Sequence, residues 1–215
     1  LTRTYDMARM QWKSNGNTYE FLFASPTPIQ INRFNKPVLH EHLWGTYNTF
    51  GKKAEVYVLK HRQIGLVESV VTGGRWMQPI GKKYKLMVEP VVERVKRGLL
   101  TSAEGAVAAA VTRKIGMVDV SVEYKFASSG FDQMYPAAHD KIGHEDLFAF
   151  RNMNNTRTFA TWRPVKSLAV NFMYNASWLV DTRVGVFNTQ NRLIVRDTRG
   201  TAGRFAGHEF DCFRS

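Results

Sequence analysis

Charged and polar side chains recur at every second position in several stretches of the chain. Residues 118–126 read VDVSVEYKF, and the polar positions are Asp119, Ser121, Glu123 and Lys125. Because alternate residues of a β-strand lie on one face, these side chains form a stripe of cations and carboxylates. Such a stripe can hold internal ion pairs or bind an anion reversibly through charge-assisted hydrogen bonds. The pattern therefore predicts a binding surface or a pathway.

Equivalent stripes occur elsewhere in the sequence. If their apolar positions contact lipid, the polar positions face a water-filled pore, because Lys or Arg facing lipid at mid-bilayer would cost roughly 2 to 4 kcal/mol. Arginine suits a carboxylate-bearing solute, since its guanidinium holds a planar carboxylate through two bonds. For any one arginine, direct contact with the solute and a structural ion pair are equally open. The expected pathway residues are Arg9, Gln11, Lys13, Asp119, Ser121, Glu123, Lys125, Arg157, Thr161, Arg163, Asn171, Met173, Asn175, Ser177, Glu209 and Asp211.

Residues with catalytic potential are not arranged for catalysis. Ser128 and Ser129 lack the strand–turn–helix context of a nucleophile elbow, and His139 has no orienting partner in an evident triad. Gly73-Gly74 lacks the strand–loop–helix setting of a phosphate-binding loop. We therefore expect neither enzyme activity nor a cofactor.

Histidine and acidic residues gather at His40-Glu41-His42 and in the segment that follows residue 127. No third or fourth ligand on a fixed scaffold is evident, so these clusters are expected to form ordinary hydrogen bonds, and no metal site is predicted. In an extracellular loop, they could tie the segment to basic neighbours at a pore mouth. The loop residues of this set are Asp132, His139, Asp140, His144, Glu145 and Asp146.

Composition limits the class of protein. The 215 residues carry 30 Lys and Arg against 18 Asp and Glu, a formal net charge of +12, which favours a polyanionic partner such as nucleic acid, an anionic polysaccharide or lipid head groups. The single cysteine, Cys212, excludes an intramolecular disulfide and a CxxC metal site. No apolar run approaches the roughly 20 residues of a membrane-spanning helix.

The elements that must position these residues are β-strands, because alternation with period 2 dominates the sequence. Asn15-Gly16 indicates a tight hairpin, and further short connections are expected at 51–53, 80–83, 114–116 and 163–167. Longer connections are expected at 25–39, 63–70, 95–101, 127–150 and 180–205. The predicted strands are 4–13, 18–24, 41–50, 54–62, 71–79, 84–94, 102–112, 118–126, 151–162, 168–179 and 206–214.

The regular order of short and long connections favours an up-and-down meander with turns at one end and loops at the other, as in outer-membrane barrels. Several strands of nine to twelve residues fit the lengths of membrane strands. Aromatic residues beside the short turns fit an interfacial girdle, and these are Trp12, Tyr19, Phe50, Tyr84 and Trp162. Two points stay open: whether Val56 and Val58 or Tyr57 and Leu59 face outward, and whether 101–111, which has high helix propensity, forms a strand.

The segment after residue 127 resembles the alginate export family of outer-membrane porins. The similar positions are Phe131-Asp132-Gln133, Tyr135-Pro136, His139-Asp140, Gly143-His144, Asp146-Leu147-Phe148, Arg151-Asn152, Trp178-Leu179, Asp181-Thr182-Arg183, Val195-Arg196-Asp197, Ala202-Gly203-Arg204-Phe205 and Gly207-His208-Glu209-Phe210-Asp211. The similarity is most specific from about 128 to 211. It is looser at residues 33–37 and 43–62.

This resemblance implies an integral β-barrel of about eighteen strands in the outer membrane of a Gram-negative bacterium, with a basic lumen that passes an alginate-like polyuronate or small anions. It also implies contact with outer-membrane lipid, lipopolysaccharide and periplasmic export partners. Eleven strands form a single domain over residues 1–215, and the odd number is expected only of an internal portion of a longer barrel. Loop arginines such as Arg192, Arg196 and Arg199 could bind lipopolysaccharide phosphates at the outer rim.

Two other classes remain as alternatives. A soluble β-rich module could bind nucleic acid if a basic stripe followed the phosphates and aromatic rings stacked on the bases. An outer-membrane barrel enzyme such as a lipase would need a Ser/His pair at the lipid rim, and none is evident. The porin interpretation, in which no nucleic acid is bound, accounts best for the turn rhythm and the strand lengths.

Overall fold

The computed structural model describes residues 4–27, 36–132, 148–165, 167–188 and 192–214. Within these residues, the regular elements are all β-strands, and eleven of them form one antiparallel sheet. No helix in the described parts of the chain is long and apolar enough to cross a membrane. The all-β class expected from the alternation is therefore confirmed.

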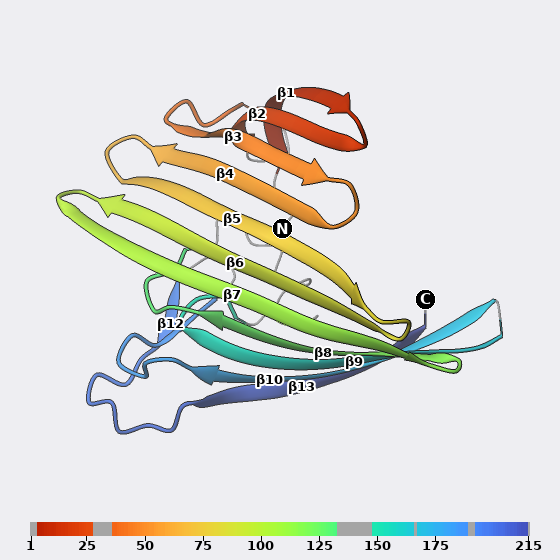
Figure 1. Ribbon diagram of the computed structural model, residues 1–215. Helices are drawn as coiled ribbons and strands as arrows, with labels where there is room; N and C mark the ends of the chain where they lie inside the picture. The colour runs from red at the N-terminus through yellow and green to blue at the C-terminus, as the bar shows by residue number, and fades with distance from the viewer. Residues whose placement is uncertain (1–3, 28–35, 133–147, 166, 189–191, 215) are drawn as a thin grey trace. The chain divides into compact units, whose positions relative to one another are not determined.

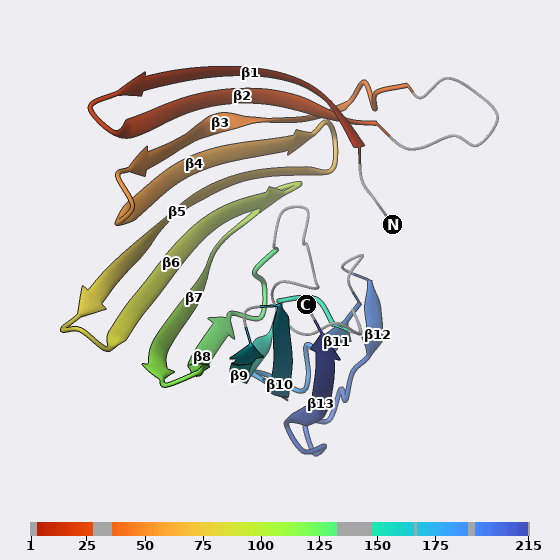
Figure 2. The same ribbon diagram turned by 90° about the vertical axis from the view of Figure 1, so that its right-hand side faces the viewer.

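The sheet is a meander in which each strand pairs with its neighbours in sequence, in the order β1 to β10 and then β13 (Figures 1 and 2). A separate two-stranded ribbon is formed by β11 and β12. The bounds are β1 Thr4–Ser14, β2 Asn17–Thr27, β3 Glu41–Phe50, β4 Ala54–Gln63, β5 Val67–Ile80, β6 Tyr84–Arg97, β7 Leu100–Ile115, β8 Val118–Ala127, β9 Met153–Val165, β10 Leu168–Leu179, β11 Val186–Phe187, β12 Leu193–Val195 and β13 Phe205–Arg214.

The short turns lie where the sequence predicts them. Ser14 pairs with Asn17 across a two-residue turn, and Asn15 and Gly16 have φ angles of 50° and 76°. Positive φ at both central positions is the requirement of a type I′ turn, which Asn-Gly meets at low cost. Gly51 and Gly81 likewise adopt positive φ at the starts of the next two turns on this edge.

Two of the predicted long connections are wrong. β4 and β5 are joined by residues 64–66 alone, and β6 and β7 by Gly98 and Leu99. The expected loops at 63–70 and 95–101 are short because β5, β6 and β7 extend to 14, 14 and 16 residues. The alternation of buried and more exposed positions continues through Ser69 and Val71, so hydrogen bonding to neighbouring strands is not interrupted there. The β11–β12 ribbon within 180–205 was also not predicted.

Both ambiguous segments form strands with a defined orientation. Val56 and Val58 are 44% and 42% exposed, and Tyr57 between them points to the other face, where its ring stacks on Tyr47 with centroids 5.6 Å apart. Residues 101–111 lie in β7. Pairing with two neighbouring strands overrides the helix propensity of this alanine-rich sequence.

The chain divides into two compact units. Unit 1 comprises Leu1–Arg75 and Val91–Ala103, and unit 2 comprises Trp76–Pro90 and Glu104–Ser215. Unit 1 holds β1 to β4 complete, and unit 2 holds β8 to β13 complete. The predicted pathway residues before Arg75 therefore belong to unit 1, and those from Asp119 onward belong to unit 2.

Candidate functional site

In unit 2, one face of the sheet buries polar side chains and the other exposes large apolar ones, which is the reverse of the arrangement in a soluble protein. On one face of β8 to β10, polar residues are buried, among them Glu123 at 8%, Asn155 at 0% and Asn175 at 3% exposure. On the other face, large apolar residues are open, including Val122 at 49% and Phe210 at 68%. We call the first the polar face and the second the apolar face. Exposed apolar area of this extent marks a surface that contacts something other than water.

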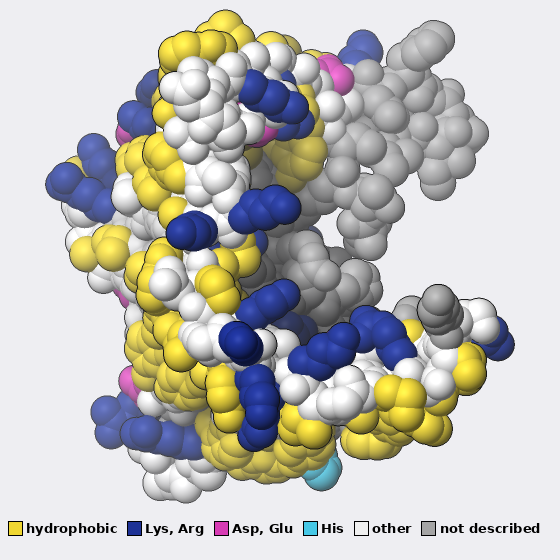
Figure 3. Space-filling view, turned by 45° about the vertical axis from the view of Figure 1, so that its right-hand side comes forward, with side chains coloured by type: hydrophobic (Ala, Val, Ile, Leu, Met, Phe, Trp, Pro, Cys, Tyr) yellow, Lys and Arg dark blue, Asp and Glu magenta, His cyan; other side chains and the backbone are white. Residues whose placement is uncertain are grey.

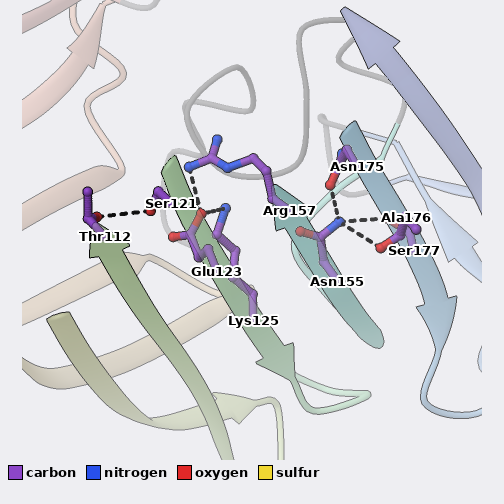
Figure 4. A network of polar contacts seen from close by, with 9 residues as sticks. All are labelled: Thr112, Ser121, Glu123, Lys125, Asn155, Arg157, Asn175, Ala176 and Ser177. Atoms are coloured by element: carbon purple, nitrogen blue, oxygen red, sulfur yellow. Dashed lines mark hydrogen bonds and ion pairs between the residues drawn. The ribbon is translucent and has the colours of Figure 1, made fainter. Parts of the chain in front are cut away.

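The most buried charged group of the polar face is the cluster of Glu123, Lys125 and Arg157 (Figure 4). Glu123 Oε2 lies 3.0 Å from Lys125 Nζ and 2.6 Å from an Arg157 guanidinium nitrogen. Lys125 is 1% exposed, and the paired position on β7 is Ala108, whose small side chain leaves room beside it. One carboxylate thus serves two cations, and the cluster carries a formal charge of +1.

Neutral polar groups extend this face along β9 and β10. The Asn155 amide donates to Asn175 Oδ1 at 2.6 Å and to Ser177 Oγ at 2.9 Å (Figure 4). Thr161 donates to Asn171 Oδ1 at 2.8 Å. These contacts bring together Asn171, Asn175, Thr161 and Ser177 as the stripes predict. Asn155, by contrast, was not among the predicted pathway residues, although it lies two positions before Arg157 on the same face.

The remaining predicted residues of unit 2 lie on the same face. Arg163 and Asp119 form an ion pair at 2.5 Å between β9 and β8. Ser121 accepts a hydrogen bond from Thr112 at 3.0 Å. On β13, Glu209 and Asp211 pair with Asn175 and Met173 of β10.

Charges on this face are close to balanced. The cations are Lys125, Arg157 and Arg163, and the acids are Asp119, Glu123, Glu209 and Asp211. The net charge of +12 is therefore not concentrated on the polar face of β8, β9, β10 and β13. Any attraction for an anion on this face must come from local geometry, such as the two cations that share Glu123.

The predicted pathway residues of unit 1 share a face as well. Arg9 and Gln11 of β1 both contact the Glu20 carboxylate of β2. Lys13 is two positions further along β1 and on the same face as Arg9. On β3 and β4, the face that holds Glu20 also carries Tyr47, which donates to Glu55 at 2.5 Å. Arg9 is engaged by an acid, which is the structural role that the sequence left open for it.

Asn152 is a structural residue that the predicted site did not include. It is fully buried with φ of 54°, and its amide donates to the carbonyls of Asp181 at 2.7 Å and Gly185 at 2.9 Å. Its own N–H donates to the carbonyl of Ser128 at 3.0 Å, so it links the two long connections that flank β9 and β10. Its presence in the family-like pair Arg151-Asn152 was the signal that could have identified it.

Of the predicted loop residues, only Asp132 is described, and it is half-buried. His139, Asp140, His144, Glu145 and Asp146 lie outside the described residues. The other histidine cluster does not converge: Glu41 contacts His61 at 3.0 Å, whereas His42 contacts Ser25 at 3.0 Å.

Asp197, which lies between β12 and β13, organises its own loop. Its carboxylate accepts the N–H of Ala202 at 2.6 Å and that of Arg199 at 2.9 Å, with the Thr201 hydroxyl at 3.2 Å. These bonds, the one from Ala202 foremost, hold the pKa of the Asp197 carboxyl below its usual value. The loop arginines Arg196 and Arg199 are therefore presented on an ordered backbone.

Aromatic residues lie beside the short turns in each unit, as the sequence predicts. Trp12 and Tyr19 lie 5.4 Å apart between ring centroids, and Tyr19 lies 6.1 Å from Phe50. In unit 2, Tyr84 is covered by the Arg113 guanidinium at 5.2 Å, and Trp162 is 42% exposed. Figure 3 shows hydrophobic side chains lying directly on the molecular surface, with Lys and Arg among them.

Known proteins resemble this chain in sequence over part of its length and in structure over most of it. The sequence model described as alginate export matches residues 127–214, in agreement with the part of the chain where the resemblance is most specific. No curated protein sequence matches the chain.

Solved structures with the same fold are outer-membrane porins of Pseudomonas aeruginosa. OpdQ is 14% identical with a TM-score of 0.60, and the matched region spans 94% of this chain and 58% of the OpdQ chain. OpdO is 12% identical with a TM-score of 0.57, covering 82% and 53%. OccK2 (OpdF), solved in complex with glucuronate, is 10% identical with a TM-score of 0.60, covering 82% and 54%. The chain thus spans a little over half the length of these porins.

At such identities the structural likeness establishes the fold. The predicted antiparallel β-barrel architecture is confirmed, and the solved proteins that share it are porins of the Gram-negative outer membrane. Residues 127–214 therefore carry the sequence signature of the alginate export family, on a sheet with the fold of the outer-membrane β-barrel porins.

Proposed function

We propose that this chain forms part of the wall of an outer-membrane channel that passes uronate-type anionic saccharides. The polar face lines the water-filled lumen, and the apolar face contacts lipid. The total of about eighteen strands expected from the resemblance belongs to this proposal, as does the longer barrel of which residues 1–215 would be a part.

The observation that carries the proposal is the sharing of Glu123 by Lys125 and Arg157. Both cations contact the same oxygen, Oε2, at 3.0 and 2.6 Å. The Arg157 side chain is 22% exposed, whereas that of Lys125 is 1% exposed. A solute carboxylate can therefore approach Arg157 and share its donors while Lys125 still neutralises Glu123. Because the solute carboxylate competes with Glu123 for Arg157, its contact with Arg157 stays weak enough for release, as transport requires.

A second line of support is the chemistry of similar proteins. Glucuronate, the molecule bound in the OccK2 structure, carries one carboxylate on a sugar ring, and alginate is a polymer of such uronates. Asn155, Asn175 and Ser177 are buried and bond to one another, so they form a neutral polar network beside the contact at Arg157. The lumen would thus provide a carboxylate contact beside a neutral polar surface.

The balance of charges refines the expectation of a basic lumen. In unit 2, anion attraction would be local, at Arg157, because acids on β8 and β13 offset the cations of the polar face. Four of the 30 Lys and Arg residues lie outside the strands at two of the short turns, and these are Lys52, Lys53, Lys82 and Lys83. These turn lysines face solvent, where salt screens them.

The decisive experiment is planar-bilayer recording of the intact protein with uronate oligomers in the bath. Oligomers should block the wild-type current at low concentration, and Arg157→Ala should raise the blocking concentration about tenfold, because a hydrogen bond to a charged group contributes about 1.5 to 3 kcal/mol. Lys82→Ala removes the same charge at a turn and should leave block unchanged. A cation-selective channel that uronates do not block would refute the proposal.

The nucleic-acid alternative is not favoured. Exposed aromatic rings such as Trp12 and Phe210 lie on the face opposite the predicted pathway stripes of their strands, so those stripes are not interleaved with these rings. The predicted contacts of Arg192, Arg196 and Arg199 with lipopolysaccharide, and the periplasmic export partners, stay predictions.

A further inference from the structure

In unit 1, the face that carries the exposed Phe23, Val56 and Val58 has a group of basic residues at one end. On β4, Lys60 and Arg62 continue the row that begins with the exposed Val56 and Val58. Residues two apart on a strand share a face, so the apolar row turns basic at its end. Lys60 and Arg62 are close to residues 64–66, which join β4 to β5 on the edge opposite the Asn15-Gly16 turn.

The same change from apolar to basic occurs on β6. Val92 is 61% exposed, and Arg94 and Lys96 follow at alternate positions, both exposed. Glu93 and Val95 between them are buried, at 0% and 1% exposure, so the basic pair points to the same outer side as Val92. We call Lys60, Arg62, Arg94 and Lys96 the rim cluster.

Glu68 of β5 connects the two halves of the rim cluster. It pairs with Lys60 at 2.5 Å, and its strand lies between β4 and β6 in the sheet. One acid therefore offsets one of four cations, which leaves the rim cluster and Glu68 with a formal charge of +3. Lys60 and Glu68 have side chains 37% and 39% exposed, so a larger anion can reach them.

Apolar and aromatic groups adjoin the rim cluster. Lys60 Nζ lies 5.5 Å from the centroid of the Trp44 ring. Trp44 pairs directly with Phe23, which is 49% exposed, and Lys60 follows Val58 on β4. The surface thus changes within one strand from a row that suits acyl chains to a row that suits phosphates.

The position along the strands distinguishes the rim cluster from the lysines at the short turns. In a meander of this kind the shorter turns are periplasmic and the longer loops extracellular. The connection from β2 to β3, residues 28–40, lies on the same edge of the sheet as residues 64–66 and is the longest in unit 1. The rim cluster therefore lies at the level of the outer leaflet.

We propose that the rim cluster and the neighbouring Trp44 and Phe23 bind the phosphorylated glycolipid of the outer leaflet, lipopolysaccharide, with its phosphates on the cations and its acyl chains on the apolar rows. The inference relies on the membrane orientation in the proposed function, but not on the substrate of the channel. We choose a lipid of this kind because its anionic phosphates lie next to its acyl chains. On β4, the cation Lys60 likewise lies next to the exposed apolar residue Val58. The site would anchor this part of the barrel to the leaflet and set its depth.

The test compares two double variants of the intact protein in detergent. Lys60→Ala/Arg62→Ala removes two rim charges, and Lys52→Ala/Lys53→Ala removes two charges from a short turn of the same unit. Binding of purified lipid A is measured by native mass spectrometry, together with heat-modifiable electrophoretic mobility to show folding. The rim variant should lose roughly tenfold or more in lipid A affinity, because two of the four cations that would contact the phosphates are removed. The turn variant should bind as wild type.

Equal lipid A binding by both double variants would overturn the proposal, as would equal affinity of the wild type for lipid A and for phosphatidylglycerol. If the rim double variant does not fold, Arg62→Gln alone carries the test, since this exposed side chain lies next to the end of β4. Uronate block of the current, recorded on the same preparations, separates the two proposals. Loss of lipid A binding with block retained supports the rim site alone, whereas absence of block in the wild type refutes only the substrate proposal.

Discussion

Arg157 and Glu123 occupy directly paired positions on β9 and β8, and a guanidinium nitrogen of Arg157 lies 2.6 Å from Glu123 Oε2. The same oxygen lies 3.0 Å from Lys125 Nζ, two residues along β8. A carboxylate that is 8% exposed thus neutralises part of the charge of a fully buried lysine. The relationship makes Glu123 a determinant of stability as well as of the charge of the polar face.

Glu123→Gln should destabilise the protein, by about 3 kcal/mol, because loss of one partner leaves buried charge without full compensation. Urea unfolding in detergent, followed by tryptophan fluorescence, measures the change. The double variant Glu123→Gln/Lys125→Met removes the buried cation as well and should recover most of the loss. A Glu123→Gln protein as stable as wild type would contradict this account of the cluster.

Val122→Arg should impair membrane assembly, whereas Ser121→Arg should leave assembly intact and alter conductance. Val122 is 49% exposed on the apolar face, where an arginine at mid-bilayer costs about 2 to 4 kcal/mol. Ser121 lies on the polar face beside Thr112. Heat-modifiable mobility in outer-membrane fractions gives the assembled share of each variant. Equal assembly of the two would refute the assignment of the apolar face to lipid.

Asn152→Ala should loosen the connections that join β8 to β9 and β10 to β13. The substitution removes the bonds to the Asp181 and Gly185 carbonyls and places alanine at φ of 54°, a conformation that asparagine tolerates better. Hydrogen exchange of peptides covering 181–188 should become at least several-fold faster. Peptides of β1 and β2, in unit 1, provide the internal reference and should not change.

The loop that Asp197 organises should lose order in acid. Because the folded-state pKa of Asp197 is lowered, its ionised form contributes stability above the usual value of 3.8, and this contribution disappears as the pH falls through the lowered pKa. Protease sensitivity of 197–204, assayed with pepsin between pH 2 and 5, should therefore rise toward the acid end. Asp197→Asn should be sensitive at every pH, with a weaker pH dependence.

Where the alternation is clear, the sequence alone determined that a strand forms and on which face each of its side chains lies. Alternation with period 2 is a local property, so it placed Asp119, Glu123 and Lys125 on one side of β8 and Val122 on the other. The requirement for positive φ at Asn15-Gly16 likewise depends on neighbouring residues only. For the same reason the candidate stripes on β9 and β10 were assigned to the face on which the structure places them.

Only the tertiary structure decided which residues meet across strands and how far each strand extends. Glu123 and Arg157 are 34 residues apart, and their contact depends on the register of β8 against β9, which the chain acquires through pairing. Hydrogen bonding to neighbours also extended β5 to β7 into the expected loops at 63–70 and 95–101. Asn152 became a link between two connections because it is paired with Asp181, 29 residues away. The meander order places β8 beside β9, but the register across a long connection is not a local property, so local patterns do not give the partners at such separations.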